Sequence, residues 1–331
     1  MKTDRMNEQI NEIQKITIEY LHAPVKEIKA IGTGHINKSF LVVADKKYVL
    51  QRMNGRMFYE HLSDLENNYE TYRKACLYAK EEQNSTGINS EEKGEWNCPE
   101  WVKCEAGSYF IRDDKGNIWR MYQYLESDVP KKNVEPFEAG KGIGKLHRIL
   151  DKIPRGKIKA VIPHLHDLSY YYSGYQKIKD PKAMRDKGIE AYISKNIERM
   201  LDIHLMDDSV IHADVKPDNM IFSNGRVAGF IDLDTMMRGS IFNDIADGMR
   251  YCCENKEKKY MPDRAAEFIK GIEESRKKTF TGNEKELINM AYLRNRFMLG
   301  LRYYCDYLEG NVYFENTTAQ DCLNKAQALL I

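Results

Sequence analysis

The feature that most constrains the fold of this chain is a hairpin signal inside a helical stretch. Two short apolar runs, 220–222 and 227–231, flank the sequence Ser223-Asn224-Gly225. Asn-Gly between apolar runs predicts a tight β-hairpin, because both residues accept the positive φ angles that such turns need. Helical periodicity dominates the rest of this part of the chain, over the segments 137–150, 184–205, 264–277 and 284–309. We therefore expect one hairpin embedded among helices.

The first third of the chain has a different texture. A helix is expected over 7–20 and another over 62–79, and the polar segment 81–95 is expected to be a surface loop. Alternating apolar residues predict strands within 28–50, 108–111 and 118–125, and these signals stop near Glu126. The sequence thus predicts an α+β fold of two lobes, with a β-rich N-lobe over 1–125 and a mainly helical C-lobe over 126–331.

Composition narrows the class of partner. Lys and Arg number 51 against 50 Asp and Glu, so no overall basic field exists to attract a nucleic acid or an anionic membrane. Residues 1–16 lack the apolar core of a signal peptide, and no stretch reaches the roughly 20 apolar residues of a membrane span. The seven scattered cysteines favour reduced thiols. These features predict a cytoplasmic protein for which neither a nucleic acid nor a membrane is the expected partner.

Polar residues that packing alone would not select flank the expected hairpin. Residues 212–219 read His-Ala-Asp-Val-Lys-Pro-Asp-Asn, and residues 231–234 read Ile-Asp-Leu-Asp. Phosphoryl transfer needs a carboxylate that orients the acceptor hydroxyl and takes its proton, and oxygen ligands that hold Mg²⁺ against the phosphates. Asp214 fits the first role, and Asn219 with Asp232 fits the second. Each could singly be a turn residue, but their joint spacing around a hairpin favours chemistry.

This motif resembles the catalytic segment of the aminoglycoside phosphotransferase and choline kinase group, which are small-molecule relatives of the two-lobed protein kinases. The resemblance implies that Asp214 is the catalytic base and that Asn219 and Asp232 bind Mg²⁺. It places Asp234 near the metal, in a less fixed role, and it implies that Asp244 anchors the catalytic loop.

The N-terminal part fits the same resemblance through a glycine-rich segment between two expected strands. Gly32, Gly34 and Asn37 resemble a loop that covers the phosphates of ATP, since glycines let backbone N–H groups approach phosphate oxygens. The end of the 118–125 strand resembles the hinge whose backbone usually pairs with adenine, and the residues concerned are Gln123, Tyr124 and Leu125.

One departure from the group concerns the lysine that usually holds the α- and β-phosphates from the third strand. Gln51 occupies that position by strand alternation, and Arg52 is expected on the opposite face. Either Arg52 substitutes for the lysine, or backbone amides and the metal hold the triphosphate.

Several stretches narrow the resemblance to the N-acetylhexosamine 1-kinases, namely 34–37 with 48–54, 231–240 and 301–314. This implies transfer of the ATP γ-phosphoryl group to the anomeric hydroxyl of N-acetylglucosamine or N-acetylgalactosamine. The substrate-binding residues that it suggests are His35, Asp214, Asp234, Arg302 and Tyr313. Arg302 and Asp306 lie at i,i+4 on one helix face, which without the resemblance would indicate an ordinary surface ion pair.

Other acceptors remain open within the same group. Another sugar is possible, an aminoglycoside would need a dense carboxylate patch, and choline or ethanolamine would need an aromatic box. The tyrosines over 170–175 could supply such a box, although packing of a tyrosine-rich helix explains them more simply. A metal cluster at His164 and His166 is not required by this chemistry. A kinase-like binding module without catalysis is the alternative from another class, and the sequence leaves the oligomeric state open.

Overall fold

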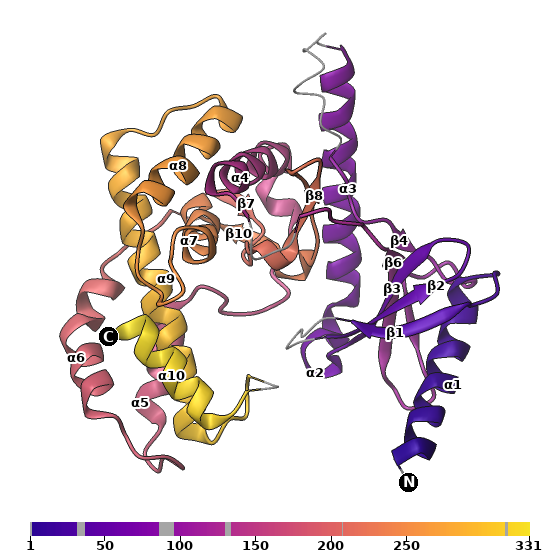
Figure 1. Cartoon of the computed structure of the whole chain (residues 1–331), viewed down its shortest axis with the longest axis horizontal. Helices are drawn as coiled ribbons and strands as arrows, with labels where there is room; N and C mark the ends of the chain where they lie inside the picture. The colour runs from indigo at the N-terminus through magenta and orange to yellow at the C-terminus, as the bar shows by residue number, and fades with distance from the viewer. Residues whose placement is uncertain (1, 32–36, 86–95, 130–133, 207, 315–316) are drawn as a thin grey trace. The chain divides into compact units, whose positions relative to one another are not determined.

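The computed structural model describes the whole chain except residues 1, 32–36, 86–95, 130–133, 207 and 315–316 (Figure 1). The chain divides into two compact units. The first comprises Met1–Glu66 and Asn97–Glu126, and the second comprises Asn67–Trp96 and Ser127–Ile331. The segment Asn67–Trp96, which precedes the expected boundary at 125/126, thus belongs to the second unit.

An antiparallel six-stranded sheet forms the centre of the first unit, in the order β1-β2-β3-β6-β4 with β5 also paired to β6. The strands are β1 (Glu27–Ile31), β2 (Lys38–Val43), β3 (Lys47–Met53), β4 (Trp101–Val102), β5 (Phe110–Arg112) and β6 (Ile118–Gln123). The short helix α2 (Gly55–Phe58) follows β3. The expected strands within 28–50 and 118–125 are therefore confirmed, and β4 is an addition.

Helix α1 (Lys2–Tyr20) covers one face of this sheet (Figure 1). Its residues Ile13, Ile16 and Tyr20 pack against Leu50 and Trp119 in one buried cluster. The Tyr20 hydroxyl reaches into the sheet and donates to the carbonyl of Trp119 at 2.8 Å. This apolar face fixes the register, because a shift by one residue would turn the buried side chains outward.

The second unit is mainly helical, as expected. Its helices are the C-terminal part of α3 (Leu62–Ser85), α4 (Pro136–Leu150), α5 (Leu168–Lys177), α6 (Lys187–Leu201), α7 (Ile241–Cys252), α8 (Pro262–Arg276), α9 (Gly282–Glu309) and α10 (Ala319–Leu330). A sheet in the first unit and helices in the second confirm the α+β class. The expectation of a loop from residue 81 is wrong for 81–85, because α3 continues to Ser85, and the rest of that loop falls on 86–95, outside the described residues.

Two short strand pairs lie among these helices. The hairpin of β8 (Met220–Ser223) and β9 (Arg226–Phe230) is confirmed, and its turn residues Asn224 and Gly225 have φ angles of 52° and 73°. Both angles fall in the region that the Asn-Gly signal anticipates. The strand β7 (Ser209–Ile211) precedes the hairpin in the sequence and β10 (Met237–Gly239) follows it, and these two strands pair with each other.

Helices α4 and α8 approach each other closely enough to bring their backbones into contact (Figure 1). A methyl group added at Gly140 would lie 2.0 Å from the carbonyl oxygen of Phe268, and one added at Gly271 would lie 2.1 Å from that of Phe137. Only glycine permits this approach at either position. On α4, Gly142 likewise faces Val227 of the hairpin, so the same helix supports the two strands that the polar residues flank.

All seven cysteines are free thiols, in agreement with the expectation from their spacing. Within the described ranges, no helix combines the length and the apolar character that crossing a bilayer would require.

Candidate active site

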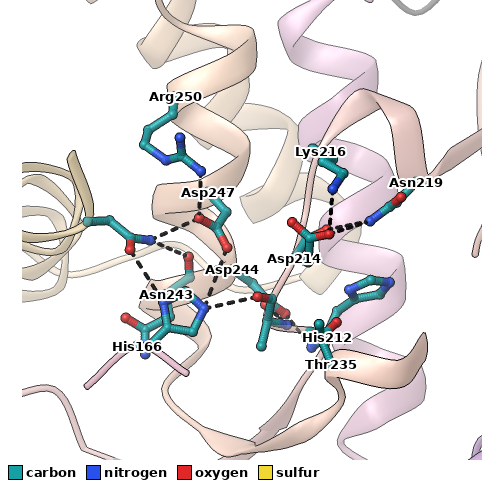
Figure 2. A network of polar contacts seen from close by, with 12 residues as sticks. His166, His212, Asp214, Lys216, Asn219, Thr235, Asn243, Asp244, Asp247 and Arg250 are labelled. Carbon is teal, nitrogen blue, oxygen red and sulfur yellow. Dashed lines mark hydrogen bonds and ion pairs between the residues drawn. The ribbon is translucent and has the colours of Figure 1, made fainter. Parts of the chain in front are cut away.

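A buried carboxylate on α7 accepts hydrogen bonds from the backbone of the loop that follows β7 (Figure 2). Asp244, on the first turn of α7, accepts the backbone N–H of His212 at 3.0 Å and that of Ala213 at 2.7 Å. His147 of α4 lies 3.1 Å from the same carboxylate, and both side chains are fully buried. Burial opposes ionisation of Asp244, but the hydrogen bond with His147 and the backbone N–H groups hold its pKa below the ordinary value. These contacts agree with the expectation that Asp244 anchors the catalytic loop.

Asp214 is the residue that this loop presents. Its carboxylate accepts from the Lys216 ammonium at 2.6 Å and from the Asn219 amide at 3.0 Å, and 31% of its side chain is exposed. Desolvation would raise the pKa of Asp214, but the charge and hydrogen bond of Lys216 outweigh it and the pKa is lowered. Asp214 is therefore ionised at neutral pH and reachable from solvent, as a residue that meets a substrate hydroxyl must be.

The hairpin brings Asn219 and Asp232 together. The carbonyl of Asn219 accepts the backbone N–H of Ile231 at 2.9 Å. Asp232 is the next residue after Ile231, so its backbone lies close to Asn219. Asp232 has a φ of 64°, a left-handed conformation that aspartate adopts more readily than most residues with a side chain, and it turns the chain out of β9. Asp234 is buried two positions further on. The three residues of the predicted centre thus lie within one folded segment of the second unit.

The donor atoms available at this segment suit a hard divalent cation. The Asn219 amide nitrogen donates to the carbonyl oxygen of Asp214 at 2.9 Å and to its carboxylate at 3.0 Å, so the amide oxygen is the atom that could meet a metal ion. An amide oxygen and the Asp232 carboxylate match the ligands that Mg²⁺ prefers. Among the described residues, no group of three or more His, Cys, Asp or Glu side chains forms a metal site, so nothing there indicates zinc.

In the first unit, Gln51 holds the position expected for the phosphate-binding lysine. Its amide accepts from the Arg120 guanidinium at 2.9 Å and donates to the Ser39 hydroxyl at 3.0 Å. Arg52 lies on the same sheet face as Leu50, opposite to Gln51. This face packs against α1. The cation that lies beside the lysine position is therefore Arg120, which the sequence reasoning missed because cross-strand pairing between β3 and β6 is not readable from local pattern.

The other expected nucleotide contacts are only partly described. Gly32 and Gly34 lie outside the described residues, and so does the expected sugar contact His35. The side chain of Asn37 accepts the backbone N–H of Asn54 at 3.1 Å, which ties the start of β2 to the end of β3.

At the expected hinge, two backbone N–H groups already have partners within the first unit. Gln123 donates to the carbonyl of Glu100 at 2.8 Å and Tyr124 donates to that of Lys47 at 2.9 Å. A base bound at this strand end would consequently use carbonyl oxygens or Leu125.

The C-terminal candidates Arg302 and Tyr313 do meet. The Arg302 guanidinium donates to the Tyr313 hydroxyl at 2.9 Å and lies 4.8 Å from the centre of the Tyr171 ring, a cation–π distance. Among the described residues, Arg302 and Asp306 form no ion pair with each other. Instead Asp306 is buried and accepts three consecutive backbone N–H groups, at 2.8, 2.7 and 3.1 Å, from Val312, Tyr313 and Phe314. Helical spacing placed the two residues correctly but could not show that Asp306 bonds to the loop.

The tyrosines over 170–175 belong to α5. Tyr171, Tyr172 and Tyr175 pack partly buried against the cluster formed by α6, α9 and α10, which supports the interpretation as helix packing. Tyr170 is exposed and stacks on His164 with the ring centroids 4.0 Å apart.

Comparison with known proteins gives three kinds of match. The family model described as the phosphotransferase enzyme family, APH, matches residues 27–277. Homoserine kinase from Phenylobacterium zucineum is 27% identical over 140 residues, which cover 41% of each chain, and homoserine kinase from Gluconobacter oxydans is 38% identical over 66 residues. The matches cover less than half the length of these curated relatives.

Solved structures share the fold over nearly the whole chain. A spectinomycin phosphotransferase in complex with ADP and spectinomycin has a TM-score of 0.59 at 16% identity, covering 97% of this chain and 93% of its own. An amicoumacin kinase in complex with AMP-PNP, Ca²⁺ and Ami has a TM-score of 0.63 at 12% identity, covering 96% of this chain and 91% of its own.

Proposed function

Because the chain belongs to the phosphotransferase enzyme family, we propose that it is a kinase that transfers the γ-phosphoryl group of ATP, with Mg²⁺, to a hydroxyl of a small molecule. The observation that carries the proposal is the convergence of Asp214, Asn219 and Asp232 within one hairpin segment. The complexes of fold relatives with ADP, and with AMP-PNP and Ca²⁺, support a nucleotide and a divalent cation.

Asp214 is proposed to orient the acceptor hydroxyl and to receive its proton. Its lowered pKa makes it a weak base, but phosphoryl transfer passes through a loose transition state in which positioning matters more than proton affinity. Lys216 and Asn219 hold the carboxylate in one orientation, and the exposed part of the side chain is left for the acceptor. The Lys216 ammonium also places positive charge at the edge of the site.

Asn219 and Asp232 are the residues proposed to hold Mg²⁺. When bound, the metal neutralises charge on the phosphate oxygens during transfer. For the nucleotide, the proposed contacts within the N-lobe (1–125) are Gly32, Gly34, Asn37 and the strand end 123–125, and Arg52 is not among them because it lies on the sheet face opposite to Gln51.

For the acceptor, we propose the anomeric hydroxyl of an N-acetylhexosamine. Arg302 and Tyr313 form a polar pair flanked by the Tyr171 ring, and sugar sites commonly combine a few polar groups with aromatic faces. Asp306 fixes the backbone that carries Tyr313, while the Tyr313 side chain itself is exposed. His35 and Asp234 are the remaining proposed sugar contacts.

The decisive experiment is a screen of ATP consumption with N-acetylglucosamine, N-acetylgalactosamine, glucose, galactose, choline, homoserine and an aminoglycoside as acceptors. Turnover with an N-acetylhexosamine, and formation of the sugar 1-phosphate detected by NMR, would support the proposal. Turnover with homoserine or another compound alone would replace the acceptor while keeping the phosphotransferase chemistry. Binding of an acceptor without any turnover would favour the kinase-like binding module.

A further inference from the structure

The catalytic loop carries a conformation that its own sequence does not favour. Ala213, which directly precedes Asp214, has a φ of 65°. An alanine in this left-handed region is disfavoured by contact of its Cβ with the backbone, so surrounding contacts must hold it there. The direction of the Asp214 side chain depends on this residue, because rotation about the Ala213 backbone would swing the next residue away.

Both polar groups of Ala213 have partners, and they come from different parts of the second unit. Its N–H donates to Asp244 of α7 at 2.7 Å. Its carbonyl accepts from Nε2 of His166 at 3.0 Å, a residue that lies 47 positions earlier in the chain. Asp244 acts at one side of the strained residue, and His166 acts at the other.

His166 is itself held in a single orientation by a buried network (Figure 2). Its Nδ1 lies 3.3 Å from the amide oxygen of Asn295 on α9. The amide nitrogen of Asn295 points toward acceptors, with the Asp247 carboxylate at 3.1 Å and the carbonyl of Asn243 at 3.4 Å. This fixes the amide so that its oxygen faces the imidazole.

The contact with the loop requires Nε2 of His166 to donate, since the Ala213 carbonyl oxygen only accepts. The Asp247 carboxylate lies 3.6 Å from the same ring nitrogen and also accepts from the Arg250 guanidinium at 3.1 Å. The backbone carbonyl of His166 also accepts from Arg294 at 3.2 Å.

We propose that His166 is a positioning residue for phosphoryl transfer, which acts by holding the Ala213 carbonyl and so sets the direction of Asp214. The role is separate from metal binding and from acceptor recognition. It rests on the proposed function only where turnover is measured, because the contact with Ala213 can be probed without a substrate.

Two substitutions at this position separate the loop contact from packing. His166→Gln keeps an amide N–H near the place of Nε2, whereas His166→Asn keeps one near Nδ1 and cannot reach the loop. His164→Gln is the matched control, because His164 lies two residues away in the same segment and pairs with Asp167 at 3.0 Å, on the surface.

With an acceptor identified, His166→Asn should lower kcat about 100-fold, because displacing a reacting group by about 1 Å costs that much. The KM for ATP should stay within about twofold, since nucleotide binding does not use this contact. His166→Gln should recover most of the lost kcat, and His164→Gln should match the wild type. Equal losses of kcat in the Gln and Asn variants, with equal falls in Tm, would overturn the positioning role in favour of packing.

Hydrogen exchange of the peptide over 211–216 tests the same contact in the absence of substrate. Exchange should be faster in His166→Asn than in the wild type, and unchanged in His166→Gln and His164→Gln. Unchanged exchange in His166→Asn would overturn the inference. If the wild type phosphorylates no acceptor, the proposed function fails, and the exchange measurement still decides whether His166 holds the loop.

Discussion

Two buried aspartates, Asp244 on α7 and Asp306 on α9, perform a similar task at different places in the second unit. Each accepts consecutive backbone N–H groups and thereby shapes a loop that carries a candidate functional side chain. Asp244 shapes the loop of Asp214, and Asp306 shapes the loop of Tyr313.

The two loops differ in what else holds them. The Asp214 loop has an imidazole against its anchoring carboxylate and a residue at positive φ with both polar groups engaged. The Asp306 carboxylate meets three backbone N–H groups and the Cys322 thiol at 3.5 Å, while Val312 and Tyr313 stay largely exposed. The first loop is therefore fixed before any ligand arrives, whereas the second keeps side chains that can adjust to one. Such a division suits an enzyme whose chemistry is constant and whose acceptor is specific.

The largest effect should come from the residue that the fixed loop presents. Asp214→Asn should lower kcat by about 10²–10⁴-fold, the range for loss of a general base, because the amide cannot accept the proton. Nucleotide binding and Tm should remain near wild-type values, since the side chain is partly exposed. Turnover within about tenfold of the wild type would remove Asp214 as the base.

Removing the anchor of that loop should cost stability as well as turnover. Asp244→Asn should lower the free energy of unfolding by about 1–3 kcal/mol, because both carboxylate oxygens accept a buried backbone N–H and the amide nitrogen of Asn cannot replace one of them. Asp180→Asn, at an exposed position of the same unit, is the control and should leave the free energy of unfolding nearly unchanged. Equal losses in urea unfolding at pH 7 would contradict the distinction.

The pH dependence of this stability follows from the lowered pKa of Asp244. A carboxyl whose pKa is lower in the folded state stabilises the fold above its unfolded pKa, about 3.9, and loses that contribution as the pH falls through the folded value. The difference in unfolding free energy between the wild type and Asp244→Asn should thus be full at pH 7 and shrink below about pH 4. A difference that grows on acidification would have the wrong sign.

The adjustable loop should respond through binding. Asp306→Asn should raise the KM for the acceptor about tenfold and lower the free energy of unfolding by about 1–3 kcal/mol, the cost of leaving buried N–H groups poorly paired. The kcat should change much less than in Asp244→Asn. Steady-state kinetics with the acceptor from the screen measure both parameters. If kcat falls as far as it does in Asp244→Asn, the loop shaped by Asp306 is not limited to acceptor binding.

The smallest effect should be that of a single hydroxyl on this loop. Tyr313→Phe removes the hydrogen bond with Arg302 and should raise the acceptor KM about 2–10-fold, because one such bond contributes about 0.5–1.5 kcal/mol. Tyr170→Phe is the control, since Tyr170 is an exposed tyrosine of α5. Equal changes in both variants would remove the Arg302–Tyr313 pair from acceptor binding.

Local patterns in the sequence predicted the elements whose cause is local. The hairpin followed from Asn224-Gly225, and α4, α8 and α9 followed from their apolar periodicity. Helix α7 was not predicted as an element, although Ile245, Met249 and Cys252 repeat at helical spacing along its buried face. The same helix carries Asp244 and Asp247, which support the site.

The same distinction between local and long-range causes applies to the residues of the candidate site. The motif around Asp214 was readable because its members are close in sequence and share a hairpin. His166 and Arg120 were not assigned roles, since each acts through a partner many positions away, across α9 and α7 or across paired strands. Long-range pairs of this kind depend on the completed fold, and no single-sequence periodicity records them.

The contact of α4 with α8 through Gly140 and Gly271 has a mechanical consequence. Packed helices usually slide past one another by small changes of side-chain rotamer, which is how shear motions arise. Here the contact is made by backbone against backbone, so no rotamer change is available at the crossing to absorb a displacement. The helix that supplies His147 is thus clamped to its neighbour, and any rearrangement during a catalytic cycle must occur by hinges in the connecting segments.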